Sequence, residues 1–182
     1  MKMECNESIG KKVQNMASIK DLVIRKADMK DAKQLSEIRL EREGGELESH
    51  LAKFKKELSK NDEDKLLLFV AEIGNNIVGF GRARYFTPPP DPPVNIAPEG
   101  WYLMGVIVRK AFRRKGIAKA LTLRRLKWLS ERASKAYYFT IVGNQASIDL
   151  HKPFGFVEIT RDFIYPGIAT ESGRGILFGI DL

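Results

Sequence analysis

The sequence predicts a mixed α/β (α+β) fold, in which a mostly antiparallel central sheet is flanked by helices on both faces. Short apolar segments of strand length alternate along the chain with longer amphipathic segments, a pattern typical of strands and of the helices that cover them. Two apolar runs at 66–73 and 77–86 enclose Gly74-Asn75-Asn76, which predicts an antiparallel hairpin. A length of 182 residues with 43% hydrophobic side chains suits one domain with a substantial core.

The segment before this hairpin is predicted to hold one strand and two helices. Residues 22–25 form the first strand. A helix begins near Asp28 to Asp31, where acidic side chains suit the positive end of the helix dipole, and it ends before Gly44-Gly45. A second helix covers 47–59.

A proline-rich connection follows the hairpin, from Thr87 to Glu99. Its core reads Pro88-Pro-Pro-Asp-Pro-Pro93, and Pro98 comes shortly after. Proline fixes φ and removes an amide donor, so neither a helix nor an inner strand can form here. We therefore expect an extended surface loop.

The apolar run from Trp101 to Val108 predicts a strand, and an amphipathic helix follows from Gly116 to about Ala133. The connecting turn ends in Arg113-Arg114-Lys115-Gly116-Ile117-Ala118. Amides at a helix N-terminus lack intrahelical partners and lie at the positive end of the dipole, so this turn suits an anion such as a pyrophosphate. An ordinary strand-to-helix turn with a solvated basic rim is the alternative interpretation.

The remaining residues are predicted to form a strand, a short helix and a closing hairpin. The strand covers 136–142, and the short helix begins near Gln145 and stops at Lys152-Pro153. Segments 155–165 and 175–180 then pair with each other.

The basic turn resembles the site on which the GNAT superfamily of N-acetyltransferases holds the pyrophosphate of acetyl-CoA. A second motif, from Asn144 to the Gly155-Phe156 pair, is similar to the family segment in which an Asn starts a short helix before a strand. Residues 22–35 also resemble the family's first strand and helix. The resemblance thus covers about 20–182 and implies an N-acetyltransferase domain there, and we expect 1–19 to form a flexible tail.

The resemblance implies that the strands at 101–108 and 136–142 splay apart and that the arm of acetyl-CoA fills the gap. No metal is expected. The implied cofactor-binding residues are Val106, Ile107, Val108, Arg113, Arg114, Lys115, Gly116, Ile117, Ala118, Lys119, Asn144 and Ser147. Without a ligand, the three strand residues would be ordinary core positions and the Asn a helix cap.

The implied reaction is direct transfer of an acetyl group to a primary amine in a ternary complex. It needs a deprotonated amine and an acid for the departing thiolate. His151 occupies the position of the family's usual Tyr acid, and its alternative is a partly exposed histidine at a helix end. Tyr102 stands where relatives often carry a base, and Glu99 is a second candidate, although both can be purely structural.

A net charge of +8 suits a polyanionic partner, and CoA is sufficient. Much of this charge lies on the helix after Gly116, where we expect the distal Arg and Lys side chains, from Arg124 onward, to face water. A non-catalytic CoA-binding or sensing module and a basic nucleic-acid-associated domain are the competing hypotheses. No zinc-finger, RRM or zipper pattern supports specific nucleic-acid binding.

No apolar run reaches the about 18 to 20 residues of a membrane span, and the first twenty residues lack the apolar core of a signal peptide. Cys5 is the single cysteine and cannot form an internal disulfide, which fits a reducing compartment. We therefore expect a cytoplasmic protein. The fold does not determine the substrate, so the sequence does not identify the acceptor amine. In the family that the chain resembles, the connection at the proline-rich loop lies near the acceptor side of the cleft. Family analogy also suggests a homodimer.

Overall fold

A seven-stranded sheet with the order β1-β2-β3-β4-β5-β7-β6 runs through the molecule. The computed structural model describes residues 21–59, 65–168 and 174–182; the predicted tail at 1–19, with Cys5, lies outside these ranges. The elements are β1 (Leu22–Lys26), α2 (Ala32–Glu43), α3 (Leu47–Ser59), β2 (Leu66–Ile73), β3 (Asn76–Phe86), β4 (Gly100–Val108), α4 (Ile117–Ser130), β5 (Lys135–Ile141), α5 (Gln145–His151), β6 (Val157–Thr160) and β7 (Gly175–Asp181).

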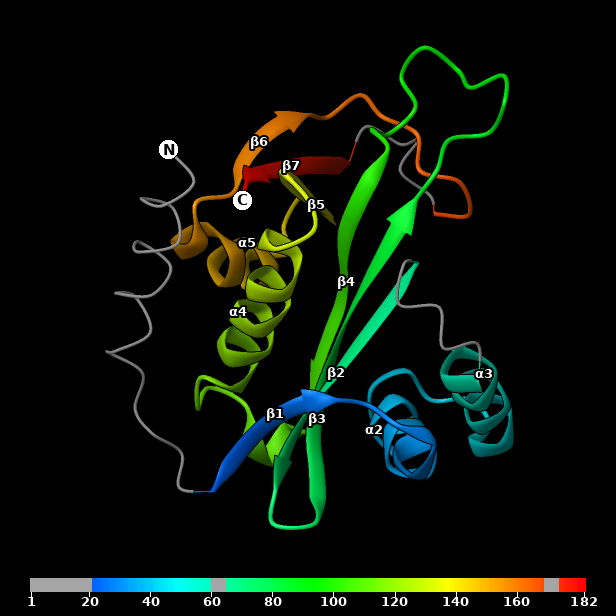
Figure 1. The fold of residues 1–182 in the computed structure, drawn as a ribbon, viewed down its shortest axis with the longest axis vertical. Helices are drawn as coiled ribbons and strands as arrows, with labels where there is room; N and C mark the ends of the chain where they lie inside the picture. The colour runs from blue at the N-terminus through cyan, green and yellow to red at the C-terminus, as the bar shows by residue number, and fades with distance from the viewer. Residues whose placement is uncertain (1–20, 60–64, 169–173) are drawn as a thin grey trace.

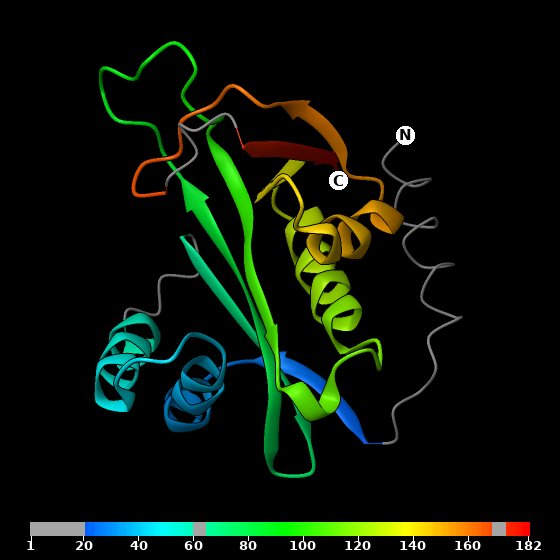
Figure 2. The same cartoon turned by 180° about the vertical axis from the view of Figure 1, so that it is seen from behind.

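Helices cover both faces of this sheet, with α2 and α3 on one face and α4 and α5 on the other (Figures 1 and 2). Neighbouring strands pair antiparallel, except for β4 and β5, which pair in parallel. The predicted fold class is therefore confirmed. None of the helices in the described ranges is long and apolar enough to cross a membrane.

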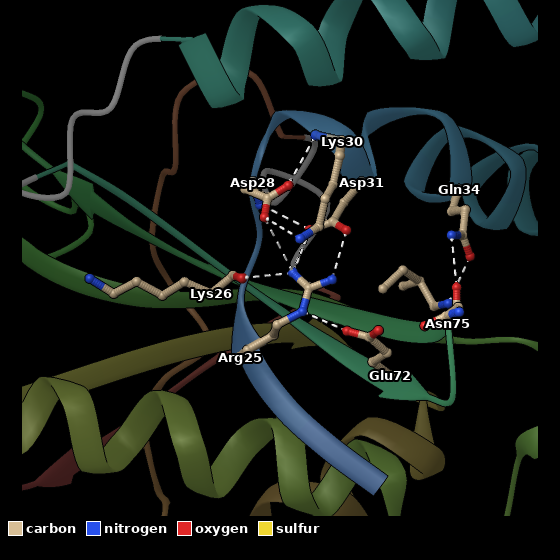
Figure 3. A network of polar contacts seen from close by, with 9 residues as sticks. Arg25, Lys26, Asp28, Lys30, Asp31, Gln34, Glu72 and Asn75 are labelled. Carbon is tan, nitrogen blue, oxygen red and sulfur yellow. Dashed lines mark hydrogen bonds and ion pairs between the residues drawn. The ribbon is translucent and has the colours of Figure 1, made fainter. Parts of the chain in front are cut away.

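The predicted hairpin is formed by β2 and β3, with Ile73 opposite Asn76 across the turn. Gln34 of α2 holds this turn, because its Nε2 donates to the Asn75 carbonyl at 3.2 Å and its Oε1 accepts from the Ile77 amide at 2.7 Å. Figure 3 shows Gln34 reaching Asn75 from the helix above the sheet. The first helix is thus tied to the hairpin end.

A polar network around Arg25 fixes the entry to α2 against the sheet (Figure 3). The Arg25 guanidinium donates to both oxygens of Asp31, at 2.7 and 2.8 Å, and to Glu72 of β2 at 2.6 Å. Asp31 ends a short 3-10 turn, η1 (Met29–Asp31), and also accepts from the Asp28 amide at 2.9 Å. Burial alone would raise the pKa of Asp31, but these hydrogen bonds outweigh burial and lower it.

The structure shortens two predicted elements. α4 ends at Ser130 rather than near Ala133. The strand predicted over 155–165 is regular only in β6, which pairs with β7 alone at the edge of the sheet. The chain turns after Thr160, whose hydroxyl accepts from the Asp162 amide at 3.0 Å. It then leaves the sheet and forms an isolated bridge to the proline-rich loop, which is a loop as predicted.

Candidate active site

The central feature of the site is a gap between β4 and β5. The two strands pair only at Trp101 with Ala136 and at Tyr102 with Tyr137. β4 continues to Val108 and β5 to Ile141 without further pairing to each other, and both views show the two strands separating (Figures 1 and 2). Beyond Tyr102, one edge of β4 therefore presents backbone donors and acceptors that no neighbouring strand uses.

A bulge interrupts β4 just past the point where the strands separate. Gly81 of β3 lies opposite Val106, whereas the next residue, Arg82, lies opposite Met104, so Gly105 is an extra residue on β4. Gly105 is exposed, and a Cβ added there would meet no other atom within 4 Å. A glycine inside an apolar run is the sequence signal from which this bulge could have been predicted.

The predicted anion-binding turn connects β4 to α4. Gly116 occupies the N-cap position in the left-handed conformation, with φ of 83°, and no side chain caps the helix. Within the described part of the chain, nothing accepts a hydrogen bond from the first-turn amides of Ile117 to Lys119. Arg113 donates from Nε to the Val108 carbonyl at 3.1 Å and so fixes the turn to the end of β4. The turn therefore has the free amides and positive charge that an anion requires.

Some predicted cofactor-binding residues can contribute only through their backbone. The Ile117 side chain is 1% exposed and belongs to the core, and Ile107 and Val108 are buried as well. Arg113, Arg114 and Lys115 are exposed at the turn. The side chains of these strand residues pack in the core, as the alternative interpretation held. Their predicted role in ligand binding therefore depends on the open backbone edge of β4.

The three predicted residues of α5 are linked by contacts within that helix. Asn144 caps the helix, because its Oδ1 accepts from the Ser147 amide at 3.3 Å. The Ser147 carbonyl in turn accepts from His151 Nδ1 at 2.8 Å. The capping interpretation of Asn144 is therefore correct, and its predicted contact with the pantetheine arm stays a prediction.

His151 is buried, with 6% exposure, and is not the partly exposed histidine of the alternative interpretation. Its ring stacks on Tyr138 of β5 at a centroid distance of 4.0 Å and meets the edge of Phe156. Burial lowers the pKa of His151 to about 4, and the positive charge of Arg125 acts in the same direction. The imidazole is therefore neutral at neutral pH.

The tautomer of His151 follows from its hydrogen bond. Because the acceptor is a carbonyl, Nδ1 carries the hydrogen and Nε2 carries the lone pair. Nε2 is buried and has no hydrogen-bond partner in the described ranges. The predicted acid role of His151 stays a prediction, and both the burial and this tautomer oppose it.

Tyr102 and Glu99, the two predicted bases, lie in different surroundings. Tyr102 is fully buried, its hydroxyl donates to the Pro98 carbonyl at 2.7 Å, and burial raises its pKa well above the ordinary value. Glu99 is exposed and accepts from the Tyr85 hydroxyl at 3.2 Å. Tyr102 is thus a protonated donor at neutral pH, and Glu99 is the candidate whose carboxyl group is exposed. Both base roles stay predictions.

Arg125 of α4 is the residue that the sequence analysis placed wrongly. We expected it to face water, but it is 1% exposed. It lies four residues after Leu121 and three after Thr122, which are both fully buried, so helical spacing alone placed it on the inner face. Its long charged side chain favoured the opposite interpretation, since Arg is almost never fully buried without a partner.

Comparison with known families decides the family of this chain. The family model described as "Acetyltransferase (GNAT) family" matches residues 32–156, which include the open edge of β4, the turn before α4 and the α5 motif. The chain belongs to the GNAT acetyltransferase family. The resemblance inferred from the two motifs is therefore confirmed. No curated protein matches the chain by sequence.

Solved GNAT structures share the fold. An aminoglycoside N-acetyltransferase in complex with CoA is 24% identical, with a TM-score of 0.63 over 79% of this chain and 93% of that one. A ribosomal-protein-alanine N-acetyltransferase from Brucella melitensis is 22% identical, with a TM-score of 0.64 over 88% and 99%. A PaiA N-acetyltransferase from Thermoplasma acidophilum in complex with coenzyme A is 16% identical, with a TM-score of 0.63 over 88% and 99%.

Proposed function

We propose that this GNAT protein is an acetyl-CoA-dependent N-acetyltransferase that moves an acetyl group to a primary amine by direct transfer in a ternary complex. The observation that carries the proposal is the continuous path along β4. The path starts at the uncapped N-terminus of α4, follows the unpaired edge of β4 and ends where β4 meets β5 at Tyr102 and Tyr137. CoA has a pyrophosphate at one end of an amide-containing arm and sulfur at the other, which fits this order of groups.

Each part of the path would hold a different part of acetyl-CoA. The free amides of Ile117 to Lys119, with the exposed charges of Arg113 to Lys115, suit the pyrophosphate. The open backbone edge around Val106 and Ile107 suits the amides of the pantetheine arm, as a strand would, whereas the Val108 carbonyl already accepts from Arg113. The acyl group would then lie between the bulge at Gly105 and the last pair of the two strands, Tyr102 with Tyr137.

The chemistry proposed for this end is a nucleophilic acyl transfer. The lone pair of an amine nitrogen forms the new bond to the thioester carbonyl carbon, the C–S bond breaks, and its electron pair leaves on sulfur. The surplus proton on nitrogen passes to a base or to water. Glu99 is the exposed carboxylate at the start of β4, and it is the base candidate that this proposal retains.

The test is a thermal shift assay with acetyl-CoA, with ADP as a ligand that carries a pyrophosphate but no pantetheine arm. A ligand at a hundred times its Kd stabilises the folded state by about 2.7 kcal/mol. We compare the natural protein with Gly116→Asp and Gly116→Asn. Asn tolerates the left-handed conformation of Gly116 and has the size of Asp without its charge, so it is the matched control.

We expect acetyl-CoA to raise the melting temperature of the natural protein, to raise it less in Gly116→Asn, and to leave Gly116→Asp unchanged. An equal shift with ADP, or none with acetyl-CoA, would refute the proposal and favour a general polyanion binder. A screen of amines with detection of acetylated product then separates the enzyme from a CoA-sensing module. Binding without turnover of any amine would support the sensing module.

A further inference from the structure

Arg125 is held entirely by backbone carbonyls and one hydroxyl. Its Nη1 donates to the Arg82 carbonyl at 2.7 Å and to the Met104 carbonyl at 3.0 Å. Its Nε donates to the Leu121 carbonyl at 3.2 Å, and its Nη2 donates to the Thr122 hydroxyl at 2.9 Å. One guanidinium thus connects α4 to both β3 and β4.

No carboxylate in the described part of the chain binds this guanidinium. Burial lowers the pKa of Arg125 to about 9, so the group still carries its positive charge at neutral pH. A buried charge without an opposite charge is costly, and an apolar residue of similar size would be cheaper for stability alone. The cost points to a role beyond packing.

The sequence leaves space for Arg125 at one position of β3. A Cβ added to Gly81 would lie 3.1 Å from Arg125 Cζ and from Nε, closer than ordinary van der Waals contact. It would also lie 3.3 Å from Val106 Cγ2. The guanidinium of Arg125 therefore occupies space that a side chain at residue 81 would fill.

The guanidinium lies at the bulge of β4. Its two strand acceptors, Arg82 and Met104, face each other in the register directly beside the extra residue Gly105. The last pair between β4 and β5, Tyr102 with Tyr137, lies two residues before Met104 along β4. His151, with its unpartnered Nε2, packs on Tyr138 of β5, which is the other wall of the gap.

We propose that Arg125 is a positioning residue of the acyl-transfer site, which holds the bulge of β4 in place and makes the closed end of the gap electropositive, so that sulfur departs as a thiolate. The inference rests on the proposed function, because that function places the sulfur at this end. It assigns a role to a residue outside the two motifs. A preorganised charge of this kind stabilises the charge that develops in the transition state.

The step is the acyl transfer itself, and Arg125 exchanges no proton in it. As the amine nitrogen bonds to the carbonyl carbon, the C–S electron pair moves onto sulfur, and the positive charge of Arg125 stabilises the resulting anion. The proton lost by the amine goes to a base or to solvent. No acid is then required at His151, whose buried Nε2 carries a lone pair.

The experiment titrates the thiol of bound CoA by its thiolate absorbance in the ultraviolet, and it needs no acceptor amine. The double variant Arg125→Leu with Gly81→Ala removes the charge and refills the space. Arg125→Gln is a second neutral variant that keeps a hydrogen-bond donor, and Arg125→Lys keeps the charge. The natural protein and its variants are compared at pH values up to about 8, where a guanidinium with a pKa of about 9 stays mostly protonated.

We expect the bound thiol to titrate about one pH unit lower in the natural protein than in either neutral variant, because a nearby cation favours the thiolate. Arg125→Lys should restore most of this difference. A purely structural role would lower the melting temperature but leave the thiol titration unchanged. The same thiol titration in the natural protein and in a folded, CoA-binding neutral variant would overturn the proposal.

Failure of the proposed function has a different signature. If the natural protein does not bind CoA, both proposals fall together. If it binds CoA and the thiol titrates alike in all variants, only the role of Arg125 falls.

Acetyl transfer to hydroxylamine, a small general nucleophile, provides a second readout. There, loss of the charge should lower kcat more than it raises KM for acetyl-CoA, since the charge acts on the transition state.

Discussion

Burial of His151 as a neutral imidazole makes the stability of the protein depend on pH between about 4 and 6.5. In the unfolded chain the imidazole binds its proton near its ordinary pKa of 6.5, whereas in the folded chain the pKa is about 4. Between these values the unfolded state binds more protons, so acidification favours unfolding. The contribution is fully present above pH 6.5 and is lost as the pH falls toward 4.

The size of this effect follows from the difference between the two pKa values. Each unit corresponds to about 1.4 kcal/mol, so the full difference corresponds to about 3 kcal/mol of unfolding free energy. Because His151 is 6% exposed, solvent screens this term little. This would be a large fraction of the stability of an ordinary domain.

Urea unfolding at a series of pH values, in the natural protein and in His151→Phe, measures the effect. Phe keeps an aromatic ring against Tyr138 but cannot titrate, and it loses the hydrogen bond to the Ser147 carbonyl. We expect the variant to be less stable at pH 7 and to have a flatter pH profile between pH 5 and 6.5. Carboxylates such as Asp31 also favour folding at higher pH, but they are present in both proteins and cancel in the difference. Parallel profiles would refute the reasoning that His151 is buried as a neutral imidazole.

Two further substitutions test the strands beside the gap. Thermal unfolding of Gly81→Ala should show a loss of stability of about 1 to 3 kcal/mol, because the added Cβ crowds the fixed Arg125 guanidinium. In the same assay Gly105→Ala should change the stability by less than about 1 kcal/mol, because its Cβ meets open space. Tyr102→Phe should cost about 1 kcal/mol, because the Pro98 carbonyl loses its donor, and should leave the rate of acetyl transfer at neutral pH nearly unchanged. A rate loss of about a hundredfold or more would instead identify Tyr102 as the base.

The sequence predicted most elements because their signals are local. Alternation of apolar residues, the Gly74-Asn75 turn and the prolines from Pro88 onward define strands, hairpin and loop without knowledge of tertiary structure. The strand predicted over 155–165 was too long for a non-local reason. Its second half contacts the proline-rich loop through the bridge of Ile164 with Ile96, and no local pattern contains this pairing.

The features of the site that could not be predicted from the sequence depend on contacts between distant segments. His151 is buried because Tyr138 of β5 and Phe156 meet around it, so its spacing on α5 did not disclose its low pKa. Arg125 was on the buried face by helical spacing, but part of the room for its guanidinium comes from the missing side chain of Gly81, which lies on the distant strand β3. The gap itself was inferred from family resemblance, because a strand that loses its partner halfway reads like any other apolar run.

His151 and Arg125 are best understood together. Burial is the main reason that the imidazole of His151 stays neutral, and the nearby positive charge of Arg125 acts in the same direction. The charge that we propose stabilises a departing thiolate therefore also helps to make His151 a poor proton donor. A chain with His in place of the family's usual Tyr, and with a buried Arg at the strand bulge, can dispense with an acid at this position, because sulfur is a good anionic leaving group once its charge is matched.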